Sequence, residues 1–196
     1  MGDSTSTPSS AGSPAPVLGK RQQCQNIIQK NIKKNSKVKF LIENLEKSGC
    51  RIGNNFIRAV NCDRPAAGGF ARGYGIEICS NYLHMEDEVV QAMIHELIHA
   101  YDDCRVANLR WSNSNHQACS EIRANHLSGD CHYLREILRG HLQLDDLRLK
   151  GHEPVCVKRR SVQSVAAHHS PAKAKIAVET VWDTCYNDTT PFDRVP

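Results

Sequence analysis

Five residues near the middle of this chain, His95-Glu96-Leu97-Ile98-His99, constrain what it can fold into more than any other stretch. On an α-helix the first and fifth side chains stack on one face, one turn apart. Two imidazoles placed in this way can bind one Zn²⁺ ion, and the glutamate that follows the first imidazole is positioned to act as a general base. The spacing therefore predicts a metal site with His95 and His99 as ligands and Glu96 as the catalytic residue of a peptide hydrolase.

The residues around this motif predict that it lies on a buried helix. Glu86, Asp87 and Glu88 come first, and negative charge is favoured at a helix N-terminus. The apolar residues that follow cover more than one helix face, which is typical of a helix inside the core. A buried histidine is usually a core residue with a hydrogen-bond partner, but two of them with a glutamate between favour a metal.

A catalytic zinc ion needs a third protein ligand and an open position for water. Glu121 is twenty-two residues past His99, in a second predicted helix, which is the gluzincin arrangement. Asp103 follows His99 on the same helix, but three ligands on one helix would spread along about 12 Å of its axis. His116 lies near the start of the Glu121 helix, as a ligand or as a donor to the transition-state oxyanion. We take Glu121 as the third ligand and keep His116 and Asp103 as alternatives.

Composition limits the chain to one folded domain with a polar start. The 196 residues are 40% hydrophobic, and no stretch approaches the roughly 18 uninterrupted apolar residues of a membrane span. Residues 1–20 are rich in Ser, Pro and Gly, and we expect a disordered tail there, followed by a metallopeptidase domain over residues 21–196. The net charge is +4, with no acidic residue between Ser4 and Ile42. That basic segment predicts either a solvated face or a patch that binds anionic lipid, and nucleic acid is not the expected partner.

Nine cysteines are spread along the chain and none forms a CxxC pair. Structural zinc sites need close thiolate pairs, so these cysteines are not read as zinc ligands. They are either small buried residues of a reduced protein or up to four disulfides with one thiol left over. So many cysteines favour the oxidised form.

The remaining pattern predicts an α-rich fold with a small sheet. Helices are expected at Arg21–Lys34, Ser36–Lys47, around the two motifs above, from Tyr133 to Leu138, at Val155–Ala167 and at Pro171–Tyr186. Strands are expected around Phe56–Val60 and Gly73–Cys79, with Gly68-Gly69 between them as a turn. Tyr74, Ile76 and Ile78 would share one face of the second strand. Its edge would pair with an extended substrate above the metal, as in zincins.

Longer motifs resemble a known family. The chain reads HELIHAYDDCR from His95 to Arg105, then ACSEIRANHLSGDC from Ala118 to Cys131, then CYND and PFDR near the end. These stretches are similar to the mitochondrial inner-membrane metalloproteases that mature and help assemble the F-type ATP synthase, also called the Ku-binding protein family. The resemblance runs from about Cys24 to Pro196.

The resemblance implies an α+β, zincin-like fold of the gluzincin type, with one Zn²⁺ per chain. By position, His95 and His99 would be zinc ligands and Glu96 the catalytic residue. It implies a protein of the intermembrane space, peripheral on the inner membrane, that processes the precursor of an ATP synthase membrane subunit and helps assemble it with prohibitin-type partners. Many relatives have a close cysteine pair before the Gly-Gly-Phe segment; here only Cys62 stands there, with Ala59 at the other position, which puts one disulfide in question.

Two other functions remain open at this stage. The protein is either a zinc endopeptidase, or mainly a non-proteolytic chaperone that holds hydrophobic subunit segments, and the two roles can coexist. A nuclear Ku-binding partner in DNA repair is the third reading, and the number of cysteines speaks against that compartment.

Overall fold

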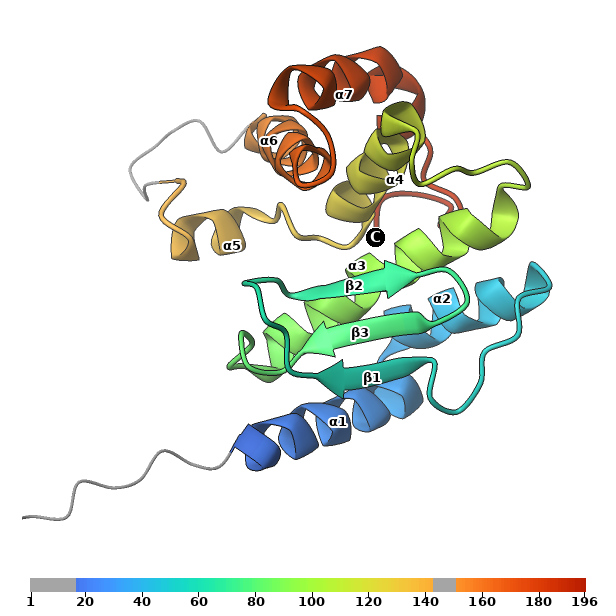
Figure 1. The fold of residues 1–196 in the computed structure, drawn as a ribbon, viewed down its shortest axis with the longest axis vertical. Helices are drawn as coiled ribbons and strands as arrows, with labels where there is room; N and C mark the ends of the chain where they lie inside the picture. Colours follow the sequence, from blue (N-terminus) through green and yellow to red (C-terminus); the bar gives the residue numbers. More distant parts are fainter. Residues whose placement is uncertain (1–16, 143–150) are drawn as a thin grey trace, which may run out of the picture.

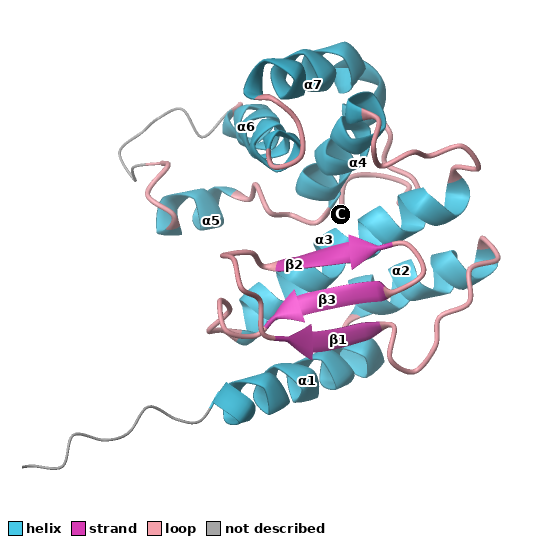
Figure 2. Ribbon diagram, in the orientation of Figure 1, coloured by secondary structure: helices cyan, strands magenta, loops and turns pink. Residues whose placement is uncertain are grey.

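The computed structural model describes residues 17–142 and 151–196, and within these ranges the chain forms seven helices and three strands (Figures 1 and 2). In chain order they are α1 (Val17–Lys34), α2 (Ser36–Lys47), β1 (Ile57–Val60), β2 (Gly68–Ala71), β3 (Gly75–Cys79), α3 (Glu86–Arg105), α4 (Ser114–Leu127), α5 (Tyr133–Leu138), α6 (His152–Ala166) and α7 (Pro171–Tyr186). Of the expected tail, residues 1–16 lie outside the described residues, and residues 17–20 are the first turn of α1.

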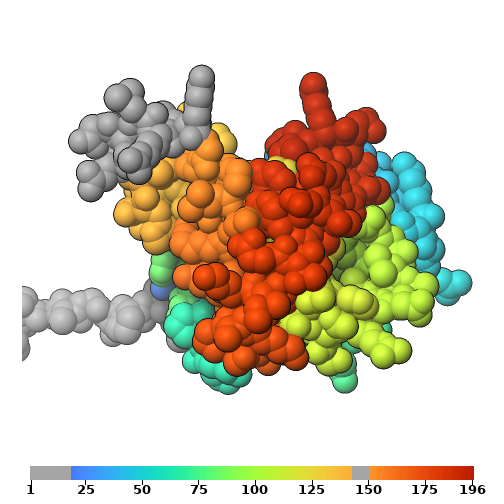
Figure 3. All heavy atoms as spheres, turned by 90° about the horizontal axis from the view of Figure 1, so that it is seen from above, coloured from blue at the N-terminus to red at the C-terminus, as the bar shows by residue number. Residues whose placement is uncertain are grey.

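The predicted α+β fold with a small mixed sheet is confirmed. The strand order is β1-β3-β2, with β1 parallel and β2 antiparallel to the central β3. Helix α3 runs behind the sheet in Figure 1, while α6 and α7 lie at the top of the view. Seen from above, α6 and α7 form the face turned toward the viewer (Figure 3). The residues of the HExxH motif thus lie in the middle of α3, between the sheet and the C-terminal helices.

Two local predictions about the sheet are wrong. Gly68-Gly69 is not a turn but the first half of β2, which pairs with β3. Tyr74 does not share a strand face with Ile76 and Ile78, because the chain turns before Gly75 and leaves Tyr74 74% exposed. The two isoleucines are fully buried, as expected.

Close packing explains why a glycine occupies the strand at position 68. A Cβ there would lie 2.7 Å from the Glu77 carbonyl oxygen and 3.4 Å from Cγ of Glu96. Only a residue without a side chain lets β2 pass this close to α3. A glycine inside a strand can mark such an approach of two backbones, and not only a turn.

The free edge of the sheet belongs to β2, not to the strand that precedes α3. Strand β3 is paired on both sides, so the predicted substrate-pairing edge at residues 73–79 is wrong. The outer edge of β1 is covered by α1, whose Gln25 and Arg21 bond the backbone of Ala59. Ala67, just before β2, accepts a hydrogen bond from Cys79 of β3, and Ala71 at the end of β2 accepts one from Tyr74 in the turn before β3. By alternation, the backbone groups of Gly68 and Phe70 point away from the sheet.

Local signals in the sequence account for most helix ends. Glu88 accepts hydrogen bonds from the backbone of His84 and Met85 and so caps α3, with acidic residues in its first turn. The bounds of α2, α5 and α7 are those predicted, and α7 starts with a Ser170 cap followed by proline. Helix α1 begins at Val17, before the expected Arg21, and α6 begins at His152 instead of Val155.

Two groups of buried apolar residues hold the fold together. The first joins α1, α2, the sheet and α3, and includes the fully buried Ile28, Leu41 and Met93. The second joins α4, α6 and α7. Helix α4 contributes to both groups, with Leu127 in the first and Ile122 in the second. The boundary between the two therefore runs along the contact of α3 with α4.

All nine cysteines lie in the described ranges, and eight form disulfides. The bonds are Cys50–Cys104, Cys62–Cys79, Cys119–Cys185 and Cys131–Cys156, and the buried Cys24 is free. The prediction of four bonds and one thiol is confirmed. The expected difficulty at Cys62 is not borne out, because Cys62 pairs with Cys79 across the sheet region and does not need a cysteine at position 59.

Candidate active site

Three of the predicted site residues converge between α3 and α4. His95 and His99 present their Nε2 atoms 3.1 Å apart, and each lies 3.7 Å from an oxygen of Glu121. One ligand atom from each residue can be chosen so that all lie within 4.8 Å of one another. The three side chains are at most 13% exposed. Helix α3 supplies the i and i+4 histidines, and α4 crosses it to bring the carboxylate opposite them.

A second set of polar residues orients each imidazole. The Nδ1 of His95 lies 2.9 Å from Asp130 Oδ2, and the Nδ1 of His99 lies 2.8 Å from Ser120 Oγ. Ser120 in turn donates to Asp102, at 2.9 Å. With the Nδ1 hydrogen atoms given to these acceptors, both Nε2 atoms are free to bind a metal.

Asp102 is itself held by a buried arginine. Arg123 has a side chain that is 0% exposed, and its Nε lies 2.9 Å from Asp102. The remaining guanidinium nitrogens bond the backbone oxygens of Asp188 and Thr190. The series of hydrogen bonds that starts at His99 and passes through Ser120 and Asp102 thus ends, through Arg123, on the segment that follows α7.

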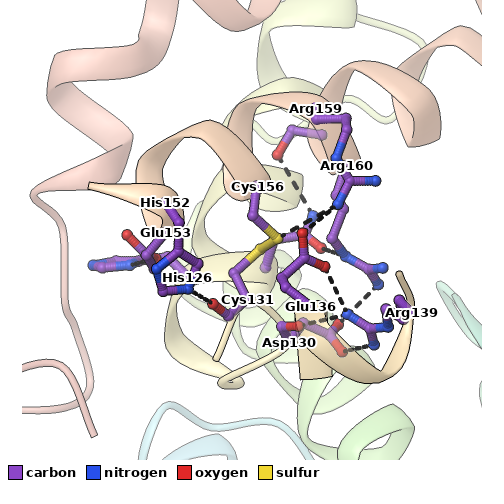
Figure 4. The surroundings of a disulfide bond; sticks show 12 residues. His126, Asp130, Cys131, Glu136, Arg139, His152, Glu153, Cys156, Arg159 and Arg160 are labelled. Atoms are coloured by element: carbon purple, nitrogen blue, oxygen red, sulfur yellow. Dashed lines mark hydrogen bonds and ion pairs between the residues drawn. A yellow bond between two sulfur atoms is a disulfide. The ribbon is translucent and has the colours of Figure 1, made fainter. Parts of the chain in front are cut away.

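Asp130 is fixed by arginines and by a neighbouring disulfide. Figure 4 shows Arg139 and Arg160 directed at its carboxylate, with separations of 3.4 and 3.3 Å. The next residue, Cys131, is bonded to Cys156 of α6. Although burial raises its pKa, the hydrogen bond with His95 and the arginine charges outweigh that effect and hold the pKa of Asp130 well below its usual range.

The residues fit a zinc ion. Two neutral imidazole nitrogens and one carboxylate are the donor set of a catalytic zinc site with room for water. Oε2 of Glu121 is buried without a hydrogen-bond partner, which is costly for a carboxylate oxygen unless a cation binds it. Both histidines also have the carboxylate or hydroxyl partners that metal-binding histidines need. The site therefore satisfies the requirements of a His-His-Glu metal centre.

The protonation pattern shows how strongly the site attracts positive charge. Burial lowers the pKa of His99 to about 4. Burial acts on His95 in the same direction, but the hydrogen bond with Asp130 and the nearby carboxylate of Glu121, 3.7 Å away, prevail and raise its pKa to about 10. One imidazole thus carries a proton between two carboxylates. A metal ion must displace that proton, so metal binding weakens as pH falls.

Glu96 lies beside the ligands and is not one of them. It is 7% exposed, and burial raises its pKa to about 7, with the charges of Glu121 and Asp130 acting in the same direction. The backbone N–H of Phe70 in β2 donates to it. A carboxyl group with a pKa near neutrality is suited to take up and release a proton during a reaction.

A groove of about 690 Å³ opens over these residues. Its lining includes His95, Glu96, His99 and Glu121, together with Gly68, Gly69 and Phe70 of β2 and residues after the end of α6. Trp111 also lines it, with its ring 5.8 Å from that of His99. A second cavity of about 340 Å³ adjoins Glu96 and His95 on the side of Arg135, Arg139 and Arg160.

The two alternative third ligands do not join the cluster. Asp103 bonds Arg72 and the indole N–H of Trp111 and does not face the histidine pair. His116 accepts a hydrogen bond from the Arg110 backbone at 3.0 Å, and the cap of α4 is Asn113. Glu121 is the candidate that the structure brings to His95 and His99.

Several residues of this site are not predicted by the sequence motifs. Asp130, Ser120 and Asp102 orient the ligands, and Gln117 and His169 line the groove. The one available signal was spacing, since Ser120 precedes Glu121 and Asp130 follows it in a recognised motif. Nothing in the sequence places the residues after α6 next to α4.

The chain matches the Peptidase M76 family over residues 22–193. It is 40% identical to the mitochondrial inner membrane protease ATP23 of Yarrowia lipolytica over 81% of this chain and 62% of that protein. It is 38% identical to the human mitochondrial inner membrane protease ATP23 homolog over 89% of this chain and 71% of the human protein.

The Schizosaccharomyces pombe protein, also named mitochondrial inner membrane protease atp23, is 33% identical over 89% of this chain and 94% of its own length. The chain thus spans less than two thirds of the Yarrowia protein and nearly all of the S. pombe one. No solved structure is significantly similar. The family match covers most of the residues and all of the site just described. The chain belongs to the Peptidase M76 family and is similar over most of its length to proteins named mitochondrial inner membrane protease ATP23.

Proposed function

We propose that the protein is a zinc-dependent metalloendopeptidase with a gluzincin-type site. His95, His99 and Glu121 hold the metal, and Glu96 is the catalytic residue. The observation that carries the proposal is the buried meeting of the three ligands with an unpartnered Glu121 oxygen, directly beside a glutamate with a pKa of about 7. The family membership independently supports a peptidase.

The residues of the chain divide the chemistry between them. When bound, zinc supplies a Lewis acid that polarises the scissile carbonyl and makes water more acidic. Glu96 accepts a proton from the attacking water and delivers it to the leaving amine. The Phe70 N–H that bonds Glu96 keeps the carboxylate oriented toward the groove. Asp130 and Ser120 keep the two imidazoles in the tautomer that binds metal.

The edge of β2 is the proposed platform for the substrate. The N–H and C=O of Gly68 and the C=O of Phe70 point away from β3, while the Phe70 N–H is bonded to Glu96, and both residues line the groove above the ligands. An extended peptide that adds to this edge would lie across the metal site, with main-chain bonds giving affinity. Since Gly68 has no side chain, the peptide can approach Glu96 closely.

The names of the relatives support a proposal for the biological setting. Those compared are named mitochondrial inner membrane proteases, and we propose that this protein acts in the intermembrane space, peripherally on the inner membrane. Among the described helices, none has the length and apolar character to cross a bilayer. Four disulfides suit an oxidising compartment and argue against the nuclear Ku-binding role. The proposed substrate is the precursor of an ATP synthase membrane subunit, with prohibitin-type assembly partners.

Replacing Glu96 by Gln tests the mechanism. The variant should keep its fold and one zinc per chain, but cleave the subunit precursor about 10²- to 10⁴-fold more slowly, because the proton acceptor is lost. Cleavage is followed with tagged precursor, and zinc is counted by atomic absorption. Glu43→Gln, an exposed glutamate on α2, is the matched control and should behave as wild type. Equal rates for Glu96→Gln and wild type would refute the mechanism.

The same variant separates proteolysis from assembly. If assistance to ATP synthase assembly depends on binding alone, Glu96→Gln will restore assembly in cells that lack the protein while precursor accumulates. Loss of both at normal protein abundance would remove the separate chaperone role and leave the peptidase proposal intact.

A further inference from the structure

Three buried polar side-chain atoms of the described residues have no hydrogen-bond partner, and all three residues line the same groove. They are Gln117 Oε1, Glu121 Oε2 and His169 Nε2. A metal accounts for the Glu121 oxygen and leaves Gln117 and His169 unexplained. Buried polar atoms without partners are rare, because each one loses its hydrogen bonds to water and gains no hydrogen bond in the protein. A groove that gathers them indicates a ligand that supplies the missing groups.

Gln117 is a fixed hydrogen-bond acceptor in this groove. It precedes Glu121 by four residues on α4, so the two side chains lie on one face, one turn apart. The residue is only 7% exposed, and its Nε2 lies 3.1 Å from Nδ1 of His168. With the amide NH₂ donating to that imidazole nitrogen, Oε1 has only acceptor character. The partner missing from Gln117 is therefore an N–H donor for its Oε1.

His169 enters the groove from another element. It follows the last turn of α6, which packs on α4, and its Nε2 is buried without a partner. A protonated imidazole nitrogen at this position can donate to a carbonyl oxygen. With the hydrogen on Nε2 of His169, the two unexplained atoms call for one N–H and one C=O, which are the two groups that nearly every residue of a peptide backbone carries.

We propose that Gln117 and His169 are substrate-binding residues that hold the main chain of an extended peptide. Gln117 Oε1 accepts a substrate N–H, and His169 Nε2 donates to a substrate C=O. This inference rests on the proposed peptidase function and specifies its substrate class. The site takes unfolded, extended chain segments through their backbone, in addition to the contacts offered by β2, and so tolerates many side chains.

The test measures binding apart from cleavage. Fluorescent carboxymethylated casein, an unfolded chain, is titrated by anisotropy into zinc-loaded Glu96→Gln protein, and then into the same protein carrying Gln117→Leu or His169→Phe. We expect about 3- to 10-fold weaker binding for each added change, the effect of one lost hydrogen bond. In the otherwise wild-type enzyme, KM for casein should rise by a similar factor, with kcat changed less.

Matched controls make the same two types of substitution at exposed positions outside the groove. Gln163→Leu, on an exposed position of α6, and His84→Phe, on an exposed loop, should leave casein affinity unchanged. A second measurement compares a decapeptide with an analogue in which one backbone amide is an ester. At the position that faces Gln117, the ester should weaken binding to the parent protein and have little effect on Gln117→Leu.

The outcomes separate this inference from the proposed function. Unchanged casein affinity in both groove variants, with zinc bound and wild-type cleavage intact, would overturn the inference alone. So would a Glu96→Gln parent that does not bind casein, because backbone recognition predicts binding of any unfolded chain. A wild-type protein without zinc, or Glu96→Gln that still cleaves, overturns the proposed function instead.

Discussion

At the scale of single residues, the site depends on side chains whose neighbours are set far away in the sequence. His95 and His99 meet because a helix repeats every 3.6 residues. Their orientation comes from Ser120, on α4, and from Asp130, just after the end of α4. A histidine that binds metal through Nε2 needs an acceptor for its Nδ1–H, and these two residues provide one each.

Removing the Ser120 hydroxyl should weaken metal binding without unfolding the protein. In Ser120→Ala, His99 loses the acceptor for its Nδ1–H and the link to Asp102. We expect about 10- to 100-fold lower zinc affinity, measured by competition with a chromogenic chelator. Ser161→Ala is the control, because Ser161 is as deeply buried as Ser120 but lies on α6, away from the proposed ligands. An unchanged affinity in Ser120→Ala would show that the hydroxyl does not support His99.

The site residues that can be predicted from sequence are those fixed by local geometry, and the others depend on contacts between distant elements. His95, Glu96 and His99 follow from local helix geometry, and Glu121 from motif spacing and the need for a third ligand. Asp130, Gln117 and His169 act through contacts between elements that no local pattern relates. Asp103 was a reasonable alternative on α3, but Arg72 and Trp111 occupy its carboxylate.

At the scale of elements, α3 and β2 together form the site. Helix α3 carries the motif, and β2 lies across it with its open edge along the groove. The helices were predictable because caps, proline and apolar periodicity are local signals. Strand β2 was not, because its glycines resemble a turn and only the packing against Glu77 and Glu96 shows why they are needed.

A side chain at position 68 should disturb both the sheet and the active site. In Gly68→Val the new atoms would meet the Glu77 carbonyl and Cγ of Glu96, which forces β2 away from α3. We expect a loss of about 1–3 kcal/mol in unfolding free energy, measured in urea, and a fall in peptide cleavage. Gly69→Ala is the control, since its added methyl has open space. Equal stability of the two variants would contradict the packing argument.

At the scale of the whole molecule, the three proposed metal ligands lie where the two groups of buried apolar residues meet. The α1–α3 core with the sheet supplies both histidines, and the α4, α6 and α7 core supplies Glu121. The disulfides respect this division, because two lie between residues 50 and 104 and two between residues 119 and 185. Each core is cross-linked by its own two disulfides, and the packing of α3 against α4 joins the two cores.

The Cys119–Cys185 bond should be important for the C-terminal core. It ties α4, which carries Glu121, to α7 across 66 residues. In Cys119→Ala with Cys185→Ala we expect about 2–5 kcal/mol less unfolding free energy by urea denaturation, because a long loop regains freedom in the unfolded chain. Cys24→Ala, which alters a buried thiol and no bond, is the control. A double variant as stable as this control would mean that packing alone holds α7 on α4.

The pairing of cysteines also has a topological consequence. Cys62–Cys79 is enclosed by Cys50–Cys104, and Cys131–Cys156 by Cys119–Cys185, so no two bridges interleave. A nested pattern of this kind can be closed in any order, since no ring has to be passed through another. The two bonds of each half of the polypeptide can therefore form independently of the two bonds of the other half.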